Sequence, residues 1–95
     1  MNYEFSEDKN RCLLESRGLG FREVIKALNE GRLLETIDHY NINKYPNQRI
    51  YIIDIDEYVY LVPFVRKNEE TIFLKTLFPS RKLTKQYLIK KVQDE

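Results

Sequence analysis

The chain has 95 residues, a length that fits one hydrophobic core, so we predict a single domain over residues 1–95. Its 33% charged and 42% hydrophobic residues exclude a disordered chain, and no apolar run approaches the about 20 residues that span a bilayer. The single cysteine, Cys12, excludes an intramolecular disulfide, and the acidic start lacks a secretory signal. We therefore expect a cytoplasmic protein.

The net charge of +1 hides an uneven distribution of charge along the chain. Residues 1–38 contain six Lys or Arg and eight Asp or Glu, whereas residues 75–91 contain six Lys or Arg and no acid. A basic segment of this kind attracts phosphates or an acidic partner.

The N-terminal third predicts two helices. Ser6 caps a first helix over about 7–17, and Gly18 stands where that helix should stop. We expect Cys12 on its inward face, as a buried structural cysteine. The second helix ends at Gly31 and has its apolar residues at i, i+3, i+4 and i+7, namely Phe21, Val24, Ile25 and Leu28.

The middle of the chain has the period-two pattern of strands. A polar loop, Asp38–Gln48, precedes the two longest runs, and Asp56 and Glu57 form the turn of a hairpin between them. Pro63 has no N–H for a ladder, which predicts a bulge or a frayed end there. The predicted strands are Leu33–Thr36, Arg49–Ile55, Tyr58–Val65 and Thr71–Phe78.

The C-terminal end predicts one more helix, over about 81–92, with Ser80 as its cap. Its inner face would consist of Leu83, Tyr87, Leu88 and Val92. The predicted fold class is α+β, with two N-terminal helices, an antiparallel β-sheet of three to four strands, and one C-terminal helix packed on the sheet.

Metal and cofactor chemistry has little support in the residues. One histidine and one cysteine far apart do not make a zinc site, and Asp56 and Glu57 lie in a turn, where acids are common for backbone reasons. Phosphate-binding glycine loops and nucleophile-elbow motifs are absent from the sequence. We expect neither a metal nor a cofactor.

A basic and aromatic cluster is the main candidate site. Lys75 falls in the last predicted strand, while the start of the last helix offers free N–H groups that suit a phosphate. The alternative is an ordinary solvated helix face. The residues of the cluster are Lys75, Ser80, Arg81, Lys82, Lys85 and Tyr87.

The polar loop before the first long strand adds His39, Lys44 and Arg49. The imidazole of a free histidine has a reference pKa near about 6.5, so His39 is a candidate acid or base. Arg49 is better suited to clamp a phosphate, because arginine stays protonated.

The segments FSEDKNRCLLESRGLGFREVIKAL, YPNQRIYIIDIDEYVYLVPFV and IFLKTLFPSRKLTKQYL together cover most of the chain. In order and spacing they resemble BrnT-type toxins, which belong to the RelE-like superfamily of bacterial type II toxin–antitoxin systems. The resemblance implies a RelE-like endoribonuclease, a hydrolase that cuts RNA without a metal and is held inactive by a cognate antitoxin in a hetero-oligomer.

The resemblance also implies roles for residues. Arg49 matches the basic residue that opens the first long strand, Lys75 the basic residue of the last strand, and Arg81 the segment before the final helix. Gln48 stands where relatives often have an acid, which puts an acid–base role there in doubt. The expected catalytic residues are Lys75, Arg81, His39 and Arg49, and the expected RNA-binding residues are Lys44, Ser80, Lys82, Lys85 and Tyr87.

Two other functions stay open at this point. The chain could be a non-catalytic RNA- or protein-binding module on the same fold, since Lys for Arg is not a conservative change at a charge-dependent site. It could also be an interaction protein that binds an acidic peptide on its basic helix.

Overall fold

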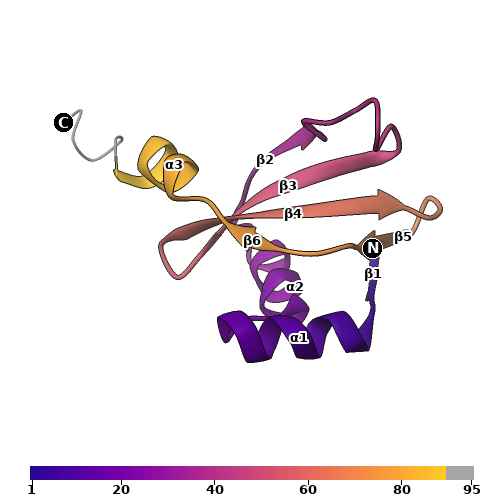
Figure 1. Ribbon diagram of the computed structural model, residues 1–95, viewed down its shortest axis with the longest axis horizontal. Coiled ribbons are helices and arrows are strands. Elements are labelled where there is room, and N and C mark those ends of the chain that lie inside the picture. Colours follow the sequence, from indigo (N-terminus) through magenta and orange to yellow (C-terminus); the bar gives the residue numbers. More distant parts are fainter. Residues whose placement is uncertain (90–95) are drawn as a thin grey trace.

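The computed structural model describes residues 1–89, which form a mixed sheet between helices (Figure 1). The elements in chain order are β1 (Asn2–Phe5), α1 (Glu7–Arg17), α2 (Phe21–Asn29), β2 (Leu33–Asp38), β3 (Gln48–Ile55), β4 (Tyr58–Arg66), β5 (Thr71–Leu74), β6 (Phe78–Pro79) and α3 (Arg81–Thr84), which continues as a π-helical turn over Lys85–Ile89. Strands lie in the order β1-β5-β4-β3-β2, and β6 pairs with β4.

The two N-terminal helices confirm the sequence prediction closely. Ser6 Oγ accepts the Lys9 N–H at 3.2 Å, and Gly18 ends α1 with a φ of 70° in the left-handed region. Cys12, however, is exposed, so the expectation of a buried cysteine was wrong. α1 packs through Asn10 and Leu13 instead, and this leaves Cys12 outside the contact face.

A buried amide joins α1 to α2. Asn10, only 4% exposed, accepts the N–H of Phe21 through Oδ1 at 2.8 Å. This bond satisfies one of the free donors at the start of α2, whose own cap, Gly20, has no side chain. The segment 18–20 is therefore a helix-to-helix turn.

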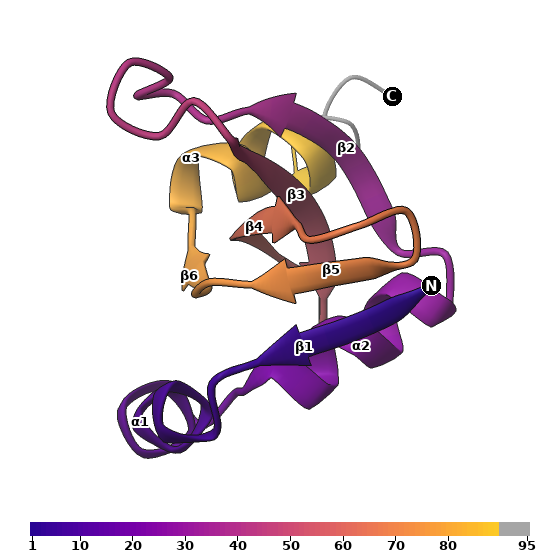
Figure 2. The same ribbon diagram turned by 90° about the vertical axis from the view of Figure 1, so that its right-hand side faces the viewer.

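The core lies between α1, α2 and one face of the sheet (Figure 2). Alternation along β3 sends Tyr51, Ile53 and Ile55 to this face, and Ile50 and Ile52 to the face crossed by the C-terminal segment. Because both faces are covered, β3 and β4 show nearly continuous burial. The helical residues in the core are Leu13, Leu19, Phe21, Val24 and Ala27.

The β3–β4 hairpin was predicted correctly. Asp56 and Glu57 form its two-residue turn with φ of 53° and 64°, the left-handed values that a tight hairpin turn needs. The sheet nevertheless has six strands, not three to four, and it is not purely antiparallel. β1 pairs in parallel with β5, with Tyr3 opposite Ile72, a pairing that the short acidic start did not reveal.

Pro63 divides the last predicted strand into two. Its carbonyl accepts the Lys75 N–H at 2.9 Å, so the side of β4 on which Pro63 has no N–H is the side of residues 75–77. Pro63 cannot donate a hydrogen bond to these residues. The ladder breaks there, and Thr71–Phe78 becomes β5 and β6. Pro63 itself lies in a continuous register opposite Ile50, without the expected bulge.

The C-terminal helix begins at Arg81, as predicted, but it is less regular than expected. It is α-helical over Arg81–Thr84 and π-helical over Lys85–Ile89, and the rest of the predicted range, residues 90–92, lies outside the described residues. Thr84, 4% exposed, anchors the segment, since its Oγ1 accepts the Val59 N–H at 2.9 Å. None of the helices in residues 1–89 is long and apolar enough to span a bilayer.

Candidate functional site

Lys75 lies on the surface immediately after β5. Its side chain is exposed, with Nζ 5.3 Å from the centre of the Phe73 ring. Its backbone N–H is fixed to Pro63, so the position of the side chain depends on the break in the ladder. An exposed ammonium on a flexible stem is suited to bind a phosphate oxygen.

Ser80 is a helix cap. Its Oγ accepts the Leu83 N–H at 3.1 Å, and its backbone N–H donates to Val59 O at 2.9 Å. Its carbonyl receives the hydroxyl of Thr84 at 2.7 Å. The cap prediction is therefore confirmed. These bonds hold the start of α3 firmly, and with it the backbone of Arg81.

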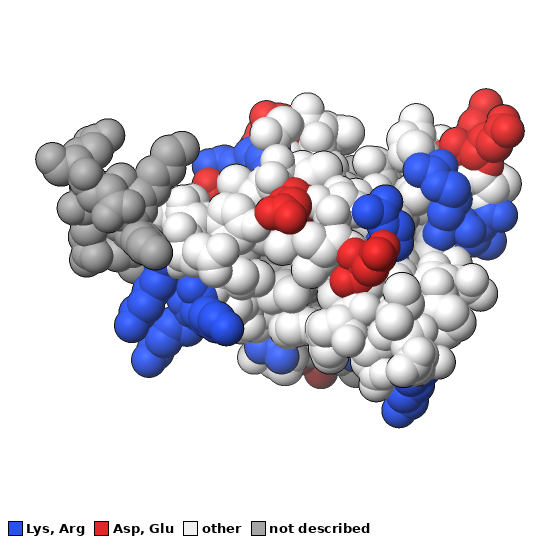
Figure 3. All heavy atoms as spheres, turned by 90° about the horizontal axis from the view of Figure 1, so that it is seen from above, with Lys and Arg blue, Asp and Glu red and all other residues white. Residues whose placement is uncertain are grey.

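The segments that carry Lys75 and Arg81 bond to different positions along β4. Residue 75 bonds to residue 63 and residue 80 to residue 59, an offset of four strand residues. At about 3.4 Å per residue this offset is about 14 Å. Arg81, Lys82 and Lys85 are exposed. Figure 3 shows the basic side chains on the upper face as separate groups, one beside the grey C-terminal residues.

His39 is buried, at 7% exposed, although it follows the edge strand β2. Its ring lies 4.5 Å from the ring of Tyr40 and 4.6 Å from that of Tyr45, centre to centre. Its Nδ1 accepts the Asn41 N–H at 3.0 Å, so a neutral His39 has its proton on Nε2. The loop thus holds His39 as a packing residue, while Lys44 is exposed beside Tyr45.

Arg49 and Lys75 lie on opposite faces of the sheet. Arg49 pairs with Phe64, and Phe64 pairs with Leu74, so these three side chains share one face. Lys75, the next residue, faces the other way. The structure therefore places Arg49 and Lys75 on opposite faces, and it does not bring the four predicted catalytic residues together.

Arg49 instead lines a pocket that sequence reasoning missed. The pocket has a volume of about 360 Å³ and is formed by strands β2, β3 and β4 and the loop before β3. Tyr51 and Phe64 stack in it with ring centres 4.0 Å apart and planes 14° apart. Its lining residues are Thr36, Asn47, Arg49, Tyr51, Phe64 and Arg66.

The pKa of the Tyr51 hydroxyl depends on the charged groups around this pocket. Burial raises the pKa of Tyr51 above 10.0, and Tyr3 raises it further, while Arg66 and Arg49 act in the opposite direction. Both guanidiniums therefore lie within electrostatic reach of the hydroxyl. Because the pKa of Tyr51 is raised, its phenol is neutral at pH 7 and adds no negative charge to the pocket.

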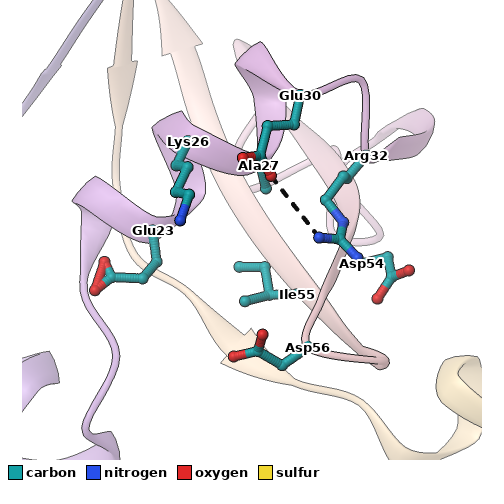
Figure 4. A pocket seen from close by; sticks show the side chains of 8 residues that line it. All are labelled: Glu23, Lys26, Ala27, Glu30, Arg32, Asp54, Ile55 and Asp56. Carbon is teal, nitrogen blue, oxygen red and sulfur yellow. Dashed lines mark ion pairs between the residues drawn. The ribbon is translucent and has the colours of Figure 1, made fainter.

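A second pocket, of about 110 Å³, lies between α2 and the β3–β4 turn (Figure 4). Two of its acidic side chains already have partners within the protein. Glu30 forms an ion pair with Arg32 at 3.8 Å, and Asp54 Oδ1 accepts the Glu57 N–H at 3.0 Å. Among residues 1–89, no group of three or more His, Cys, Asp or Glu side chains is arranged to hold a metal ion.

Tyr87 bonds within the protein. Its hydroxyl donates to Glu35 Oε1 of β2, so the C-terminal segment crosses β3 and reaches the edge strand. This bond, more than burial, raises the pKa of Tyr87. Tyr87 is half-buried, which leaves one side of its ring for other contacts.

Replacing Tyr87 with Phe should lower stability in a pH-dependent way. The raised pKa of Tyr87 means that the bond to Glu35 stabilises the fold fully below the unfolded value of 10.0 and is lost as pH rises through the folded pKa. Urea unfolding should show a loss of at most about 1 kcal/mol at pH 8 that disappears in strong alkali. An equal loss across the whole range would point to packing instead of the bond.

Comparison with known proteins defines the fold. No family model matches the chain, and no curated protein sequence matches it. The arrangement of helices and sheet is, however, similar to that of a solved structure. The crystal structure of the Brucella abortus ribonuclease toxin BrnT superposes with a TM-score of 0.63 over 84% of this chain and 96% of that chain, at 14% sequence identity.

Proposed function

We propose that this protein is a metal-independent endoribonuclease toxin of a type II toxin–antitoxin system. The observation that carries the proposal is the shared fold, which covers 96% of the chain of a ribonuclease toxin. The exposed cations Lys75, Arg81, Lys82 and Lys85 support it, since phosphate contacts are made by Lys and Arg. The expected location is the cytoplasm, where both RNA and an antitoxin are available.

The proposed reaction uses the 2′-hydroxyl of RNA as the nucleophile. The 2′ oxygen attacks the adjacent phosphorus, the bond to the 5′ oxygen breaks, and the 2′ proton passes to solvent while the leaving oxygen takes one up. Lys75 and Arg81 stabilise the negative charge on the phosphate, an effect that preorganised cations provide well. Ser80 holds Arg81 in place through the helix cap.

The remaining predicted residues have secondary parts in this proposal. Lys44, Lys82 and Lys85 attract the RNA backbone, and Tyr87 offers a ring for stacking while it ties the C-terminal segment to Glu35. His39 positions its loop, because its ring is buried and its Nδ1 is engaged. A cognate antitoxin would inhibit by covering the same cations with acidic side chains.

The test is expression and cleavage. Induction of the chain without an antitoxin should arrest bacterial growth, and the purified protein should cut single-stranded RNA in the presence of a metal chelator. The products should end in a 2′,3′-cyclic phosphate and a 5′-hydroxyl. Cleavage that disappears with chelator and returns with a divalent ion would contradict the proposed mechanism.

A non-catalytic RNA-binding module is the second candidate. The observation that favours it is the separation of the predicted catalytic residues: Arg49 faces away from Lys75, and His39 is buried. Salt-sensitive RNA binding without cleavage and without growth arrest would establish this alternative.

A further inference from the structure

The 360 Å³ pocket on strands β2, β3 and β4 differs from the surface around Lys75 and Arg81, because it has an aromatic floor as well as cations. Its floor is the stacked Tyr51–Phe64 pair, and two arginines from neighbouring strands line it. None of its lining residues comes from α1, α2 or α3. Its volume falls within the about 300–1,000 Å³ typical of small-molecule sites. We propose that this pocket binds one nucleotide, with the base against the aromatic floor and the phosphate between Arg49 and Arg66.

The two guanidiniums have donors to offer. Arg49 Nε lies 3.3 Å from Asp38 Oδ1, and Arg66 Nη1 donates to Glu69 O at 3.2 Å. Each contact uses one of the five N–H groups of an arginine. The Arg49 side chain is 54% exposed and its partner Asp38 69%, so this ion pair is weak and a phosphate can replace the carboxylate. Arg66 is exposed as well.

The aromatic floor distinguishes a nucleotide from a bare anion. Tyr51 and Phe64 stack on each other and are 9% and 5% exposed, so a base lies against the exposed edges of the rings and gains an apolar contact that a sulfate or phosphate ion cannot. Asn47 and Thr36 add an amide and a hydroxyl to the lining, and both groups can donate and accept hydrogen bonds with a base edge. The pocket thus combines an aromatic surface with phosphate contact, two features that proteins use for single nucleotides in RNA.

The pocket and the proposed cleavage site are distinct. Arg49 lies on the α1/α2 face and Lys75 on the opposite one, so a nucleotide bound here is not the one whose phosphate Lys75 contacts. The pocket is therefore a recognition subsite. The inference that the bound nucleotide belongs to single-stranded RNA rests on the proposed function. The inference that the pocket binds a free mononucleotide is independent of the proposed function.

Amide NMR spectra of the full chain test this assignment. Adenosine monophosphate should shift the backbone signals of Thr36 and Asn47, and inorganic phosphate should shift them much less. Arg66→Gln should weaken adenosine monophosphate binding by about tenfold. Asp38→Asn should tighten it severalfold, because it removes the acid that competes for Arg49. Arg11→Gln, on the exposed surface of α1, is the matched control and should leave the affinity unchanged.

A short 2′-O-methyl RNA, which has no 2′-hydroxyl to attack, separates the two sources of nucleotide. If it shifts the same amides, RNA is the source; if only the mononucleotide does, the RNA assignment is overturned. Unshifted amides with adenosine monophosphate, equal shifts with inorganic phosphate, or unchanged affinity in Arg66→Gln would overturn the nucleotide pocket. RNA cleavage by the wild-type chain, measured separately, reports on the proposed function alone, so the two proposals can fail independently.

Discussion

Replacing Gly20 with Ala should destabilise the protein by about 2–4 kcal/mol. A Cβ at this position would lie 2.4 Å from Asn10 Oδ1 and 3.1 Å from Leu14 Cγ. Overpacking of this kind costs about 1–3 kcal/mol, and displacing Asn10 also breaks its bond to the Phe21 N–H, which costs about 1 kcal/mol more. For a domain of this size the melting temperature should fall by about 10–25 °C.

A double-mutant cycle identifies the cause. The φ of Gly20 is −128°, which any residue adopts, so backbone strain is not involved. If the clash with Asn10 dominates, Gly20→Ala should cost much less in an Asn10→Ala background, with a coupling of about 1–3 kcal/mol. Gly18→Ala is the control, since a Cβ there meets nothing within 4 Å and only its left-handed φ of 70° opposes it. Additive free energies of unfolding for the pair would contradict the structure at this turn.

The helices and the hairpin could be read from the sequence because their signals are local. The cap at Ser6, the stop at Gly18 and the apolar spacing from Phe21 each lie within a few residues of the structure they determine. The parallel partner of β1 lies some seventy residues away, at Thr71–Leu74, and no local pattern records such a pairing. The break at residues 75–77 likewise depends on Pro63 in a neighbouring strand.

The pocket could have been partly predicted. A two-residue turn at Asp56 and Glu57 fixes the register of the hairpin, so Arg49 must face Phe64, and alternation then places Arg66 on the same face. Counting residues from the turn would thus have predicted that Arg49 and Arg66 lie on the same face of the sheet. The burial of His39 could not be found this way, because it results from the folding of a loop around its own tyrosines.

Removing Lys75 and Arg81 together should reduce RNA cleavage by at least about 100-fold. The backbone contacts of residues 75 and 80 are offset by about 14 Å along β4, so the long side chains of Lys75 and Arg81 can reach the same RNA strand. In the proposed mechanism both cations stabilise the negative charge on the phosphate. Loss of a preorganised charge at the reacting group typically costs about 10²–10³ in kcat.

The matched control is Lys82→Ala with Lys85→Ala, which removes the same number of positive charges from the protein. Both side chains are exposed on α3 and its continuation, where they attract the RNA backbone from a distance. This pair should raise KM and flatten the salt dependence while kcat stays close to the wild-type value. The Lys75 and Arg81 pair should lower kcat with an unchanged melting temperature. If the two double variants lose cleavage equally, the cations act only through their total charge, and the reacting phosphate lies elsewhere on the sheet.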